Sequence, residues 1–269
     1  MTIFFICRGE VPRLFIFFIY CYNYFGDNHN HMLISIIIPA YNEEKRIERT
    51  LFSISEYLSG HNYNYEIIVV NDGSKDKTAE IVNGLKHRIQ NLNLIDNKDN
   101  HGKGWVVRQG MLEARGDIIL FTDADNSTTV DHLEKMLPYF HGGYDIVIGS
   151  RRVLGSIIAV HQAGYKEFLG RLGNLWIRIF AVNGINDTQA GFKAFTARAA
   201  KIVFTRVTLD RWGFDFEALA IAKKHKLKIK EMPIRWVNDA MSHVKFSAYA
   251  KTLIEALKIR WNLLTGKYD

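Results

Sequence analysis

Residues 118–126 read IILFTDADN, and this stretch decides how the chain can fold. The four apolar residues 118–121 suit a short buried strand or part of a buried helix, and Gly116 before them favours the strand. Asp123 and Asp125 then follow one residue apart. Ligands of open α/β folds bind outside the carboxyl ends of the strands, and Mg²⁺ and Mn²⁺ take carboxylate and phosphate oxygens together. The stretch therefore predicts a divalent-metal site that holds a diphosphate.

The same two aspartates have a simpler interpretation. Asp-x-Asp is common in proteins, and either carboxylate could cap a helix expected near residues 130–139. The rest of the chain has to separate the two interpretations.

Outward from this stretch, apolar runs alternate with helical patterns. Strands are expected at 33–38, 65–70, 92–95 and 145–149, and helices at about 47–58, 77–89 and 106–112. This alternation predicts a parallel sheet with right-handed crossovers. Since parallel strands share a carboxyl end, the polar residues that follow the first, second and fourth strands should converge. Those residues are Tyr41, Glu43, Asp72, Asp123 and Asp125.

Two of these loops carry chemistry that has alternatives. Asp72 with Gly73 and Ser74 forms either a turn that caps a helix or a carboxylate that accepts from a nucleobase or ribose. Lys103 lies between two glycines, which form either a flexible turn or a close approach of backbone and charge to a ligand. The P-loop pattern is absent and no GxGxxG follows a strand, which disfavours P-loop enzymes and dinucleotide dehydrogenases.

Composition limits the classes of partner. The 269 residues, 48% hydrophobic and 23% charged, suit one large globular domain. The net charge of +7 suits a nucleotide diphosphate, a lipid phosphate, a membrane surface or nucleic acid. The basic residues are dispersed and no recognition motif is present, which argues against nucleic acid. The two cysteines, Cys7 and Cys21, form no disulfide framework or zinc spacing, so a reducing compartment is expected.

Residues 1–31 stand apart from the expected domain. The apolar run at 14–22 is far shorter than the about 20 residues of a spanning helix. It resembles a signal-peptide core without a cleavage site. A disordered extension, an interfacial anchor and translation upstream of a true start at Met32 all remain open. We expect a catalytic domain over 32–240 and an amphipathic helix within 241–269.

Taken together, the motifs resemble the family 2 glycosyltransferases. The carriers are IIIPAYNE at 36–43, VVNDGSKDKT at 69–78, NHGKG at 100–104 and DIILFTDADN at 117–126. Four later motifs resemble more narrowly the polyprenyl- or dolichyl-phosphate sugar synthases: DIVIGSR at 145–151, NDTQAGFKAF at 186–195, WGFDFEALAIAKK at 212–224 and EMPIRW at 231–236. The resemblance covers about residues 33–251. It implies the α/β GT-A fold, a mostly parallel central sheet flanked by helices that binds a nucleotide sugar.

The resemblance also implies roles for single residues. The residues it places around the nucleotide are Pro39, Tyr41, Glu43, Asp72 and Lys103. The first three would shape the nucleoside pocket, the aspartate would contact the base and the lysine would lie by the nucleotide.

The metal would lie between Asp123 and Asp125, of which Asp125 is the firmer ligand in the resembling synthases. Ser127 stands where some relatives have glutamine, so a third protein ligand is left open. Mg²⁺ or Mn²⁺ would neutralise the leaving diphosphate together with basic side chains.

Basic residues after the fifth strand could bind an anion. Arg151 and Arg152 follow that strand directly, and Arg171 is a further candidate. The alternative for each is a solvated surface arginine.

A lipid phosphate is already ionised and is its own nucleophile, so a strong base is less necessary. Asp187 occupies the position of an acidic active-site residue in the resembling family, and we expect it to orient the acceptor or the sugar, unless it only caps a turn. Gln189 and Lys193 are weaker candidates. Direct attack on the anomeric carbon predicts inversion.

Two helical stripes could meet a membrane. One runs through Phe246, Ala250, Leu253, Leu257, Trp261 and Leu264, and the other through Phe168, Leu172, Leu175, Trp176 and Ile179. Each could pack on the core or lie on the bilayer interface. We expect peripheral attachment at the cytoplasmic face.

His243 and Lys245 resemble, without the usual glycine, a loop that closes over the diphosphate.

The sequence therefore predicts an inverting, metal-dependent hexosyltransferase. Its nucleotide sugar would be UDP-glucose or GDP-mannose, and its acceptor a polyprenyl or dolichyl phosphate. Glucose is favoured because the run at 187–193 resembles the glucosyl type of synthase more than the mannosyl type. A family 2 enzyme acting on a polysaccharide or soluble acceptor is the alternative, although the QxxRW pattern of processive synthases is absent. A nucleotide-binding module without turnover is a further class, which the two intact aspartates disfavour.

Overall fold

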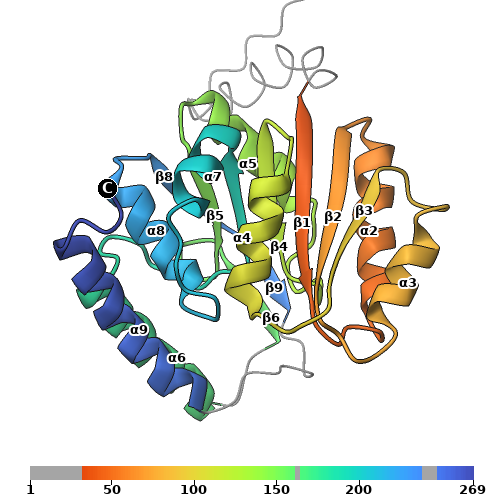
Figure 1. Ribbon diagram of the computed structural model, residues 1–269. Helices are drawn as coiled ribbons and strands as arrows, with labels where there is room; N and C mark the ends of the chain where they lie inside the picture. Colours follow the sequence, from red (N-terminus) through yellow and green to blue (C-terminus); the bar gives the residue numbers. More distant parts are fainter. Residues whose placement is uncertain (1–31, 161–163, 238–246) are drawn as a thin grey trace, which may run out of the picture.

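The computed structural model describes residues 32–160, 164–237 and 247–269, and is built on one central sheet (Figure 1). The sheet has seven strands in the order β3-β2-β1-β4-β7-β5-β8. The strands are β1 (Leu33–Ala40), β2 (Asn64–Asp72), β3 (Leu92–Asn97), β4 (Ile118–Thr122), β5 (Ile146–Ser150), β7 (Phe192–Thr196) and β8 (Ile229–Pro233). A second sheet pairs β6 (Ile157–Val160) with β9 (Arg235–Val237).

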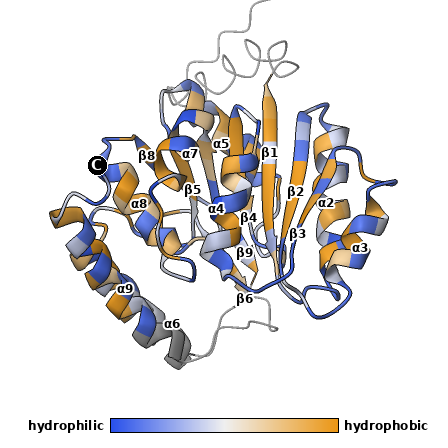
Figure 2. Ribbon diagram, in the orientation of Figure 1, coloured by the Kyte–Doolittle hydropathy of each residue, from blue (hydrophilic) through white to orange (hydrophobic). Residues whose placement is uncertain are grey.

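Helices cover both faces of the central sheet. Buried side chains of α4 (Lys103–Glu113), α7 (Ala197–Phe204) and α8 (Phe214–Lys224) pack in one hydrophobic cluster. Those of α2 (Ile47–Gly60), α3 (Thr78–Leu85) and α5 (His132–His141) pack in the other. β1 and β4 are hydrophobic along nearly their whole length because both faces of the sheet are covered (Figure 2).

The direction of the strands confirms the predicted fold class. β1 pairs in parallel with β2 and β4, β2 pairs in parallel with β3, and β5 pairs in parallel with β8. β7 lies between β4 and β5 and runs antiparallel to both, so all five predicted strands point the same way. The sequence analysis did not predict β7. It also ended the first strand before Pro39, whereas β1 continues through Pro39 to Ala40.

Two long helices, α6 (Gly164–Phe180) and α9 (Ser247–Leu264), lie side by side at one corner of the molecule (Figure 1). The faces they turn inward bury Ile177, Ala256 and Ile259, and the indole of Trp176 donates to the carbonyl of Leu253 at 3.3 Å. Most described members of the two predicted stripes stay exposed: Leu172, Leu175, Ile179, Leu253, Leu257, Trp261 and Leu264. The stripes therefore are not core faces.

Crossing a membrane would need a longer or more apolar helix than any in the ranges that the structure describes. The predicted extension 1–31 and the loop residues His243 and Lys245 lie outside those ranges. The predicted domain boundaries stay predictions.

Candidate active site

The two predicted metal-site aspartates lie directly after β4, at the carboxyl edge of the sheet. The ammonium Nζ of Lys103 is 2.6 Å from Oδ1 of Asp123, and Oδ1 of Asp125 accepts from the amide of Ser127 at 2.9 Å. Oδ1 of Asp123 is itself buried and receives no hydrogen bond of proper geometry. A buried carboxylate oxygen whose close neighbour is an ammonium group lies in a place that suits a cation.

A glycine lets the loop before β7 approach Asp123. A Cβ on Gly191 would lie only 2.1 Å from Oδ2 of Asp123, so any side chain at this position would have to displace the carboxylate. Gly191 belongs to the NDTQAGFKAF motif, but the sequence analysis did not single it out. Only the fold brings residues 123 and 191 together, through the antiparallel pairing of β4 with β7.

The electrostatics of this edge favour a bound cation. Burial and the charge of Asp123 raise the pKa of Asp125 above its ordinary value. Burial lowers the pKa of Lys103, but the charges of Asp123, Asp215 and Asp125 outweigh burial and leave that pKa raised. Added positive charge would relieve the repulsion between the carboxylates.

The residues present fit a divalent ion that takes part of its coordination from a ligand. Asp123 and Asp125 supply two carboxylates, whereas no cluster of three or more histidine, cysteine or acidic side chains suited to a metal occurs in 32–160, 164–237 and 247–269. Mg²⁺ commonly uses one or two carboxylates together with phosphate oxygens of its substrate. The site therefore fits a metal–diphosphate pair better than a metal alone.

A second ion pair lies beneath this edge. Nζ of Lys193 is 2.6 Å from Oδ1 of Asp215, it also donates to the carbonyl of Ala190, and its side chain is 1% exposed. The ammonium groups of Lys103 and Lys193 lie 5.5 and 5.8 Å from the ring centre of Phe121. Lys193 is thus buried below the site, and the sequence analysis missed its partner Asp215.

Asp72 organises the loop that leads to Lys103. Its Oδ1 accepts from the amide of His101 at 2.7 Å, and its Oδ2 accepts from the amide of Gly102 at 3.0 Å and the side chain of Asn100 at 2.9 Å. Burial raises the pKa of Asp72 more than these hydrogen bonds lower it. Both oxygens hold this loop, so the predicted contact with the base stays a prediction.

The loop after β1 joins the loop after β2, as the parallel topology requires. The amide of Asn42 donates to Oγ of Ser74 at 2.9 Å, and the amide of Glu43 donates to Oγ1 of Thr78 at 2.8 Å. The three predicted nucleoside residues differ in placement. Pro39 is buried, the carboxylate of Glu43 accepts from Arg46, and the ring of Tyr41 is 40% exposed. Tyr41 has the placement that contact with a base would need.

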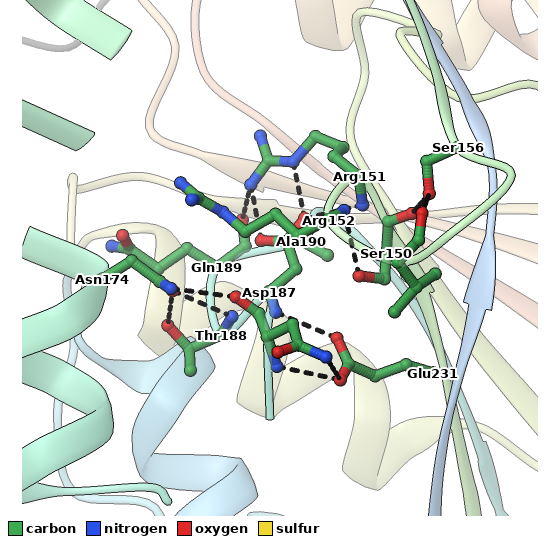
Figure 3. Close-up of polar contacts among 12 residues, drawn as sticks. Ser150, Arg151, Arg152, Ser156, Asn174, Asp187, Thr188, Gln189, Ala190 and Glu231 are labelled. Atoms are coloured by element: carbon green, nitrogen blue, oxygen red, sulfur yellow. Dashed lines mark hydrogen bonds and ion pairs between the residues drawn. The ribbon is translucent and has the colours of Figure 1, made fainter. Parts of the chain in front are cut away.

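Arg151 is fixed by a buried network (Figure 3). Asp187, 1% exposed, accepts from Nε of Arg151 at 2.7 Å and from Nη2 at 2.8 Å. Nη2 also donates to the carbonyl of Gln189 at 3.1 Å, while Glu231 accepts from the amide of Asp187 at 2.9 Å. Burial raises the pKa of Asp187, but Arg151 outweighs burial and holds this pKa at about 2.

This network shows which groups hold Asp187 in place. Its carboxylate is directed at Arg151, and its direct contact with sugar or acceptor stays a prediction. Glu231 was not predicted as a site residue, although it begins the motif EMPIRW.

A positive cluster surrounds Arg152. Burial lowers the pKa of Arg152, and the like charges of Arg151, Arg171 and Arg178 lower it further, against the opposing charge of Asp187. Repulsion of this kind is relieved by an anion. A site suited to a cation and a site suited to an anion thus share one edge of the sheet. The loop before β7 joins them, because Gly191 lies against Asp123 and the carbonyl of Gln189 accepts from Arg151.

Residues 35–174 match the sequence model of the family described as Glycosyl transferase family 2. The chain belongs to this family. Among similar curated proteins is a dolichyl-phosphate beta-glucosyltransferase of Trichomonas vaginalis, 38% identical over 84% of this chain and 72% of the relative. The protein of the same name from Homo sapiens is 32% identical over 87% of this chain and 77% of the relative.

Solved structures support the fold of this family 2 glycosyltransferase. Mannosyl-3-phosphoglycerate synthase from Rubrobacter xylanophilus superposes with a TM-score of 0.66 at 16% identity, covering 88% of this chain and 76% of that one. A glucosyl-3-phosphoglycerate synthase from Mycobacterium tuberculosis, solved with Mn²⁺ and UDP-glucose, gives a TM-score of 0.60 at 18% identity, covering 87% and 79%. The predicted GT-A fold and the predicted family are confirmed.

Proposed function

We propose that this family 2 glycosyltransferase moves glucose from UDP-glucose to dolichyl phosphate. The observation that carries the proposal is the loop before β7, which joins a carboxylate site at Asp123 to an arginine site at Arg151. The reaction needs both, because it must hold a nucleotide diphosphate and an anionic acceptor close together. The names of the relatives favour glucose and a dolichyl phosphate.

The nucleotide sugar would lie over the loops after β1, β2 and β4. The exposed ring of Tyr41 offers a face for the base, and Asp72 keeps the loop of Lys103 in place. The ammonium of Lys103 adds positive charge for the diphosphate. Asp123 and Asp125 would hold Mg²⁺ or Mn²⁺, and a bound ion supplies Lewis-acid neutralisation of the leaving diphosphate. The Mn²⁺ in a structural neighbour supports the choice of ion.

The acceptor phosphate would bind at Arg151 and Arg152, with Arg171 and Arg178 nearby. Asp187 holds the guanidinium of Arg151 in a fixed orientation, so little side-chain freedom is lost when the phosphate binds. The hydrogen bonds to Asp187 and Gln189 use Nε and Nη2 of Arg151, so Nη1 would meet the phosphate in a charge-assisted hydrogen bond. Asp187 therefore acts through Arg151 and not as a base.

In the transfer itself, an oxygen of the acceptor phosphate forms a bond to the anomeric carbon. The bond from that carbon to the diphosphate breaks at the same time, and its electron pair leaves with UDP. Attack from the face opposite to the leaving group inverts the α-linked sugar to a β-linked product. The phosphate is already ionised at neutral pH, so no side chain has to remove a proton.

The exposed stripes of α6 and α9 support attachment to the membrane that contains the acceptor. Lys251, Lys258 and Arg260 are exposed on α9 beside apolar side chains such as Trp261, which is 67% exposed. An amphipathic helix of this kind lies in the interface and attracts anionic headgroups. We infer peripheral attachment, at the cytoplasmic face where the nucleotide sugar is supplied.

The proposal is tested by label transfer with the purified full-length protein. UDP-glucose, GDP-mannose and UDP-N-acetylglucosamine are offered separately with detergent-solubilised dolichyl phosphate and Mg²⁺ or Mn²⁺, then with EDTA. We expect lipid-soluble label from UDP-glucose alone, and none with EDTA. Label transferred from GDP-mannose instead would show that the transferred sugar is mannose. Absence of label in lipid from every nucleotide sugar would refute the lipid acceptor and direct the search to a soluble or polysaccharide acceptor.

A further inference from the structure

The segment after α9 folds back onto α8 and buries a tyrosine. Tyr268 has no exposed surface, and its hydroxyl donates to Oε1 of Glu217 at 2.7 Å. The side chain of Asn262 donates to the same hydroxyl at 2.9 Å, and Nε2 of His225 lies 2.8 Å from the carbonyl oxygen of Tyr268. Lys224 pairs with Asp269 at 2.7 Å. The tyrosine is thus held on both sides.

Glu217 is fully buried and links this tyrosine to the loop before α8. Its Oε1 accepts from Oγ1 of Thr208 at 2.7 Å, and its Oε2 accepts from the amides of Thr208 at 3.0 Å and Leu209 at 2.8 Å. A buried carboxylate is costly unless its hydrogen bonds are complete. Every donor to Glu217 therefore stabilises the position of this loop, and Tyr268 is one of them.

The loop packs against both neighbours of Lys103. A Cβ on Gly104 would lie 2.4 Å from the carbonyl oxygen of Leu209, and one on Gly102 would lie 2.5 Å from that of Asp210. The amide of Trp105 donates to the carbonyl of Asp210 at 3.1 Å. The position of the backbone around Lys103 therefore depends on the position of this loop.

The loop also brings an aromatic ring to the site. The ring centre of Trp212 is 5.3 Å from Nζ of Lys103, which in turn lies 2.6 Å from Oδ1 of Asp123. Hydrogen bonds and direct packing thus connect Tyr268 to the carboxylate edge in a few steps.

We propose that Tyr268 is a positioning residue for the nucleotide-sugar site. Through Glu217 it holds residues 208–212, and these hold Lys103 and Trp212 where the diphosphate binds. The inference rests on the proposed function for the identity of that ligand. Without the hydroxyl, Glu217 loses a hydrogen bond in a site closed to water, and the loop relaxes away from the lysine.

The test uses the full chain with Tyr268→Phe, Thr208→Val and both changes together. UDP affinity with Mn²⁺ is measured by calorimetry, and KM is measured separately for UDP-glucose and for dolichyl phosphate. Each single variant should weaken UDP binding and raise the KM for UDP-glucose by about fivefold to twentyfold, which corresponds to one lost buried hydrogen bond. The KM for dolichyl phosphate should stay unchanged.

The double variant should lose less than the product of the two single effects, because both act through Glu217. Tyr144→Phe, a half-buried tyrosine whose ring contacts Tyr139, is the matched control and should bind UDP as the wild type does. Thermal unfolding fixes a temperature at which every variant is folded.

Unchanged UDP affinity in folded Tyr268→Phe and Thr208→Val would overturn the inference, as would an equal rise in both KM values. A wild-type protein that binds no UDP would instead refute the proposed function.

Discussion

At the scale of single residues, Gly191 decides whether the carboxylate of Asp123 can keep its position. The 2.1 Å between a Cβ on Gly191 and Oδ2 of Asp123 leaves no room for a methyl group. Gly191→Ala should therefore push the carboxylate aside while the buried core is kept. A displacement of about 1 Å near the chemistry can cost roughly 100-fold in rate, and we expect that loss in label transfer.

Gly84→Ala in α3 is the control for this substitution. No atom lies within 4 Å of a Cβ on Gly84, and alanine is favoured over glycine inside a helix by about 1 kcal/mol. This variant should keep its activity and melt at a slightly higher temperature. Equal activity of Gly191→Ala and Gly84→Ala would show that Asp123 is not needed where it lies.

Asp125→Asn tests the second carboxylate. The amide keeps the shape and the bond from the Ser127 amide to Oδ1, but it removes the charge that a cation needs. We expect transfer to fall by roughly 100-fold or more, with a higher Mn²⁺ concentration for half-maximal activity. Asp131→Asn, on the partly exposed residue before α5, should leave both quantities unchanged. Equal transfer rates and equal Mn²⁺ requirements for Asp125→Asn and Asp131→Asn would show that the charge of Asp125 has no part in the reaction.

Sequence reasoning found those side chains that stand directly after a strand. Asp123 and Asp125 were expected at this edge because the ends of parallel strands share it, which follows from order along the chain. Lys103 was found instead from its place between two glycines and from the family resemblance. Gly191 and Glu231 were missed because their roles depend on contacts with residues far away in sequence. Asp187 was found by resemblance, but its partner Arg151 is set by the fold.

At the scale of elements, β7 explains both a success and a failure of prediction. Its sequence FKAFT carries a lysine, and a charged residue in a central strand contradicts the apolar pattern of buried strands. The pair with Asp215 makes Lys193 tolerable there. The antiparallel insertion leaves β4 and β5 pointing the same way, so Arg151 still lies on the predicted edge.

The network that joins the ends of β5 and β8 predicts how stability depends on pH. The pKa of Asp187 is about 2, against an ordinary value of 3.8. A depressed pKa stabilises the fold fully above the ordinary value, and the contribution is lost as pH falls from about 4 to 2. It amounts to roughly 2 kcal/mol. Urea unfolding of the wild type should show this loss across that window.

Asp187→Asn should remove most of that pH dependence. It should also lower the free energy of unfolding at neutral pH by about 3 kcal/mol, because Arg151 stays buried without its partner charge. Asp76→Asn, on the partly exposed residue before α3, is the comparison, because hydrogen bonds rather than an ion pair outweigh burial and lower its pKa. Parallel pH curves for the wild type and Asp187→Asn would contradict the assignment.

At the scale of the whole molecule, the fold class could be predicted from the alternation of strands and helices. The exposure of the apolar faces of the outer helices could not be predicted in this way. The pattern of α9 allowed either a core face or a membrane face, because both are apolar at helical spacing. The structure separates them. Ala256 and Ile259 face inward, while the stripe through Leu257 and Trp261 stays exposed. Exposed apolar side chains gathered on one face are typical of an interaction surface.

The membrane proposal predicts binding of the protein to lipid vesicles. Ile254 and Trp261 on α9 are both about two-thirds exposed, at 68% and 67%. Replacing either by glutamate removes apolar contact and adds repulsion from anionic headgroups, so affinity for vesicles containing phosphatidylserine should fall about tenfold or more. Leu112→Glu on α4, at another exposed leucine, adds the same charge elsewhere and should bind vesicles almost as the wild type does.

Raising the salt concentration should weaken vesicle binding by the wild type, because salt screens the charges that Lys251, Lys258 and Arg260 contribute. If all three glutamate variants lost binding equally, net charge alone would explain attachment and the α6–α9 surface would have no special part in it. If only the α9 variants lost binding, and kept transfer to detergent-solubilised acceptor, the surface would be assigned to the membrane and the chemistry to the sheet edge.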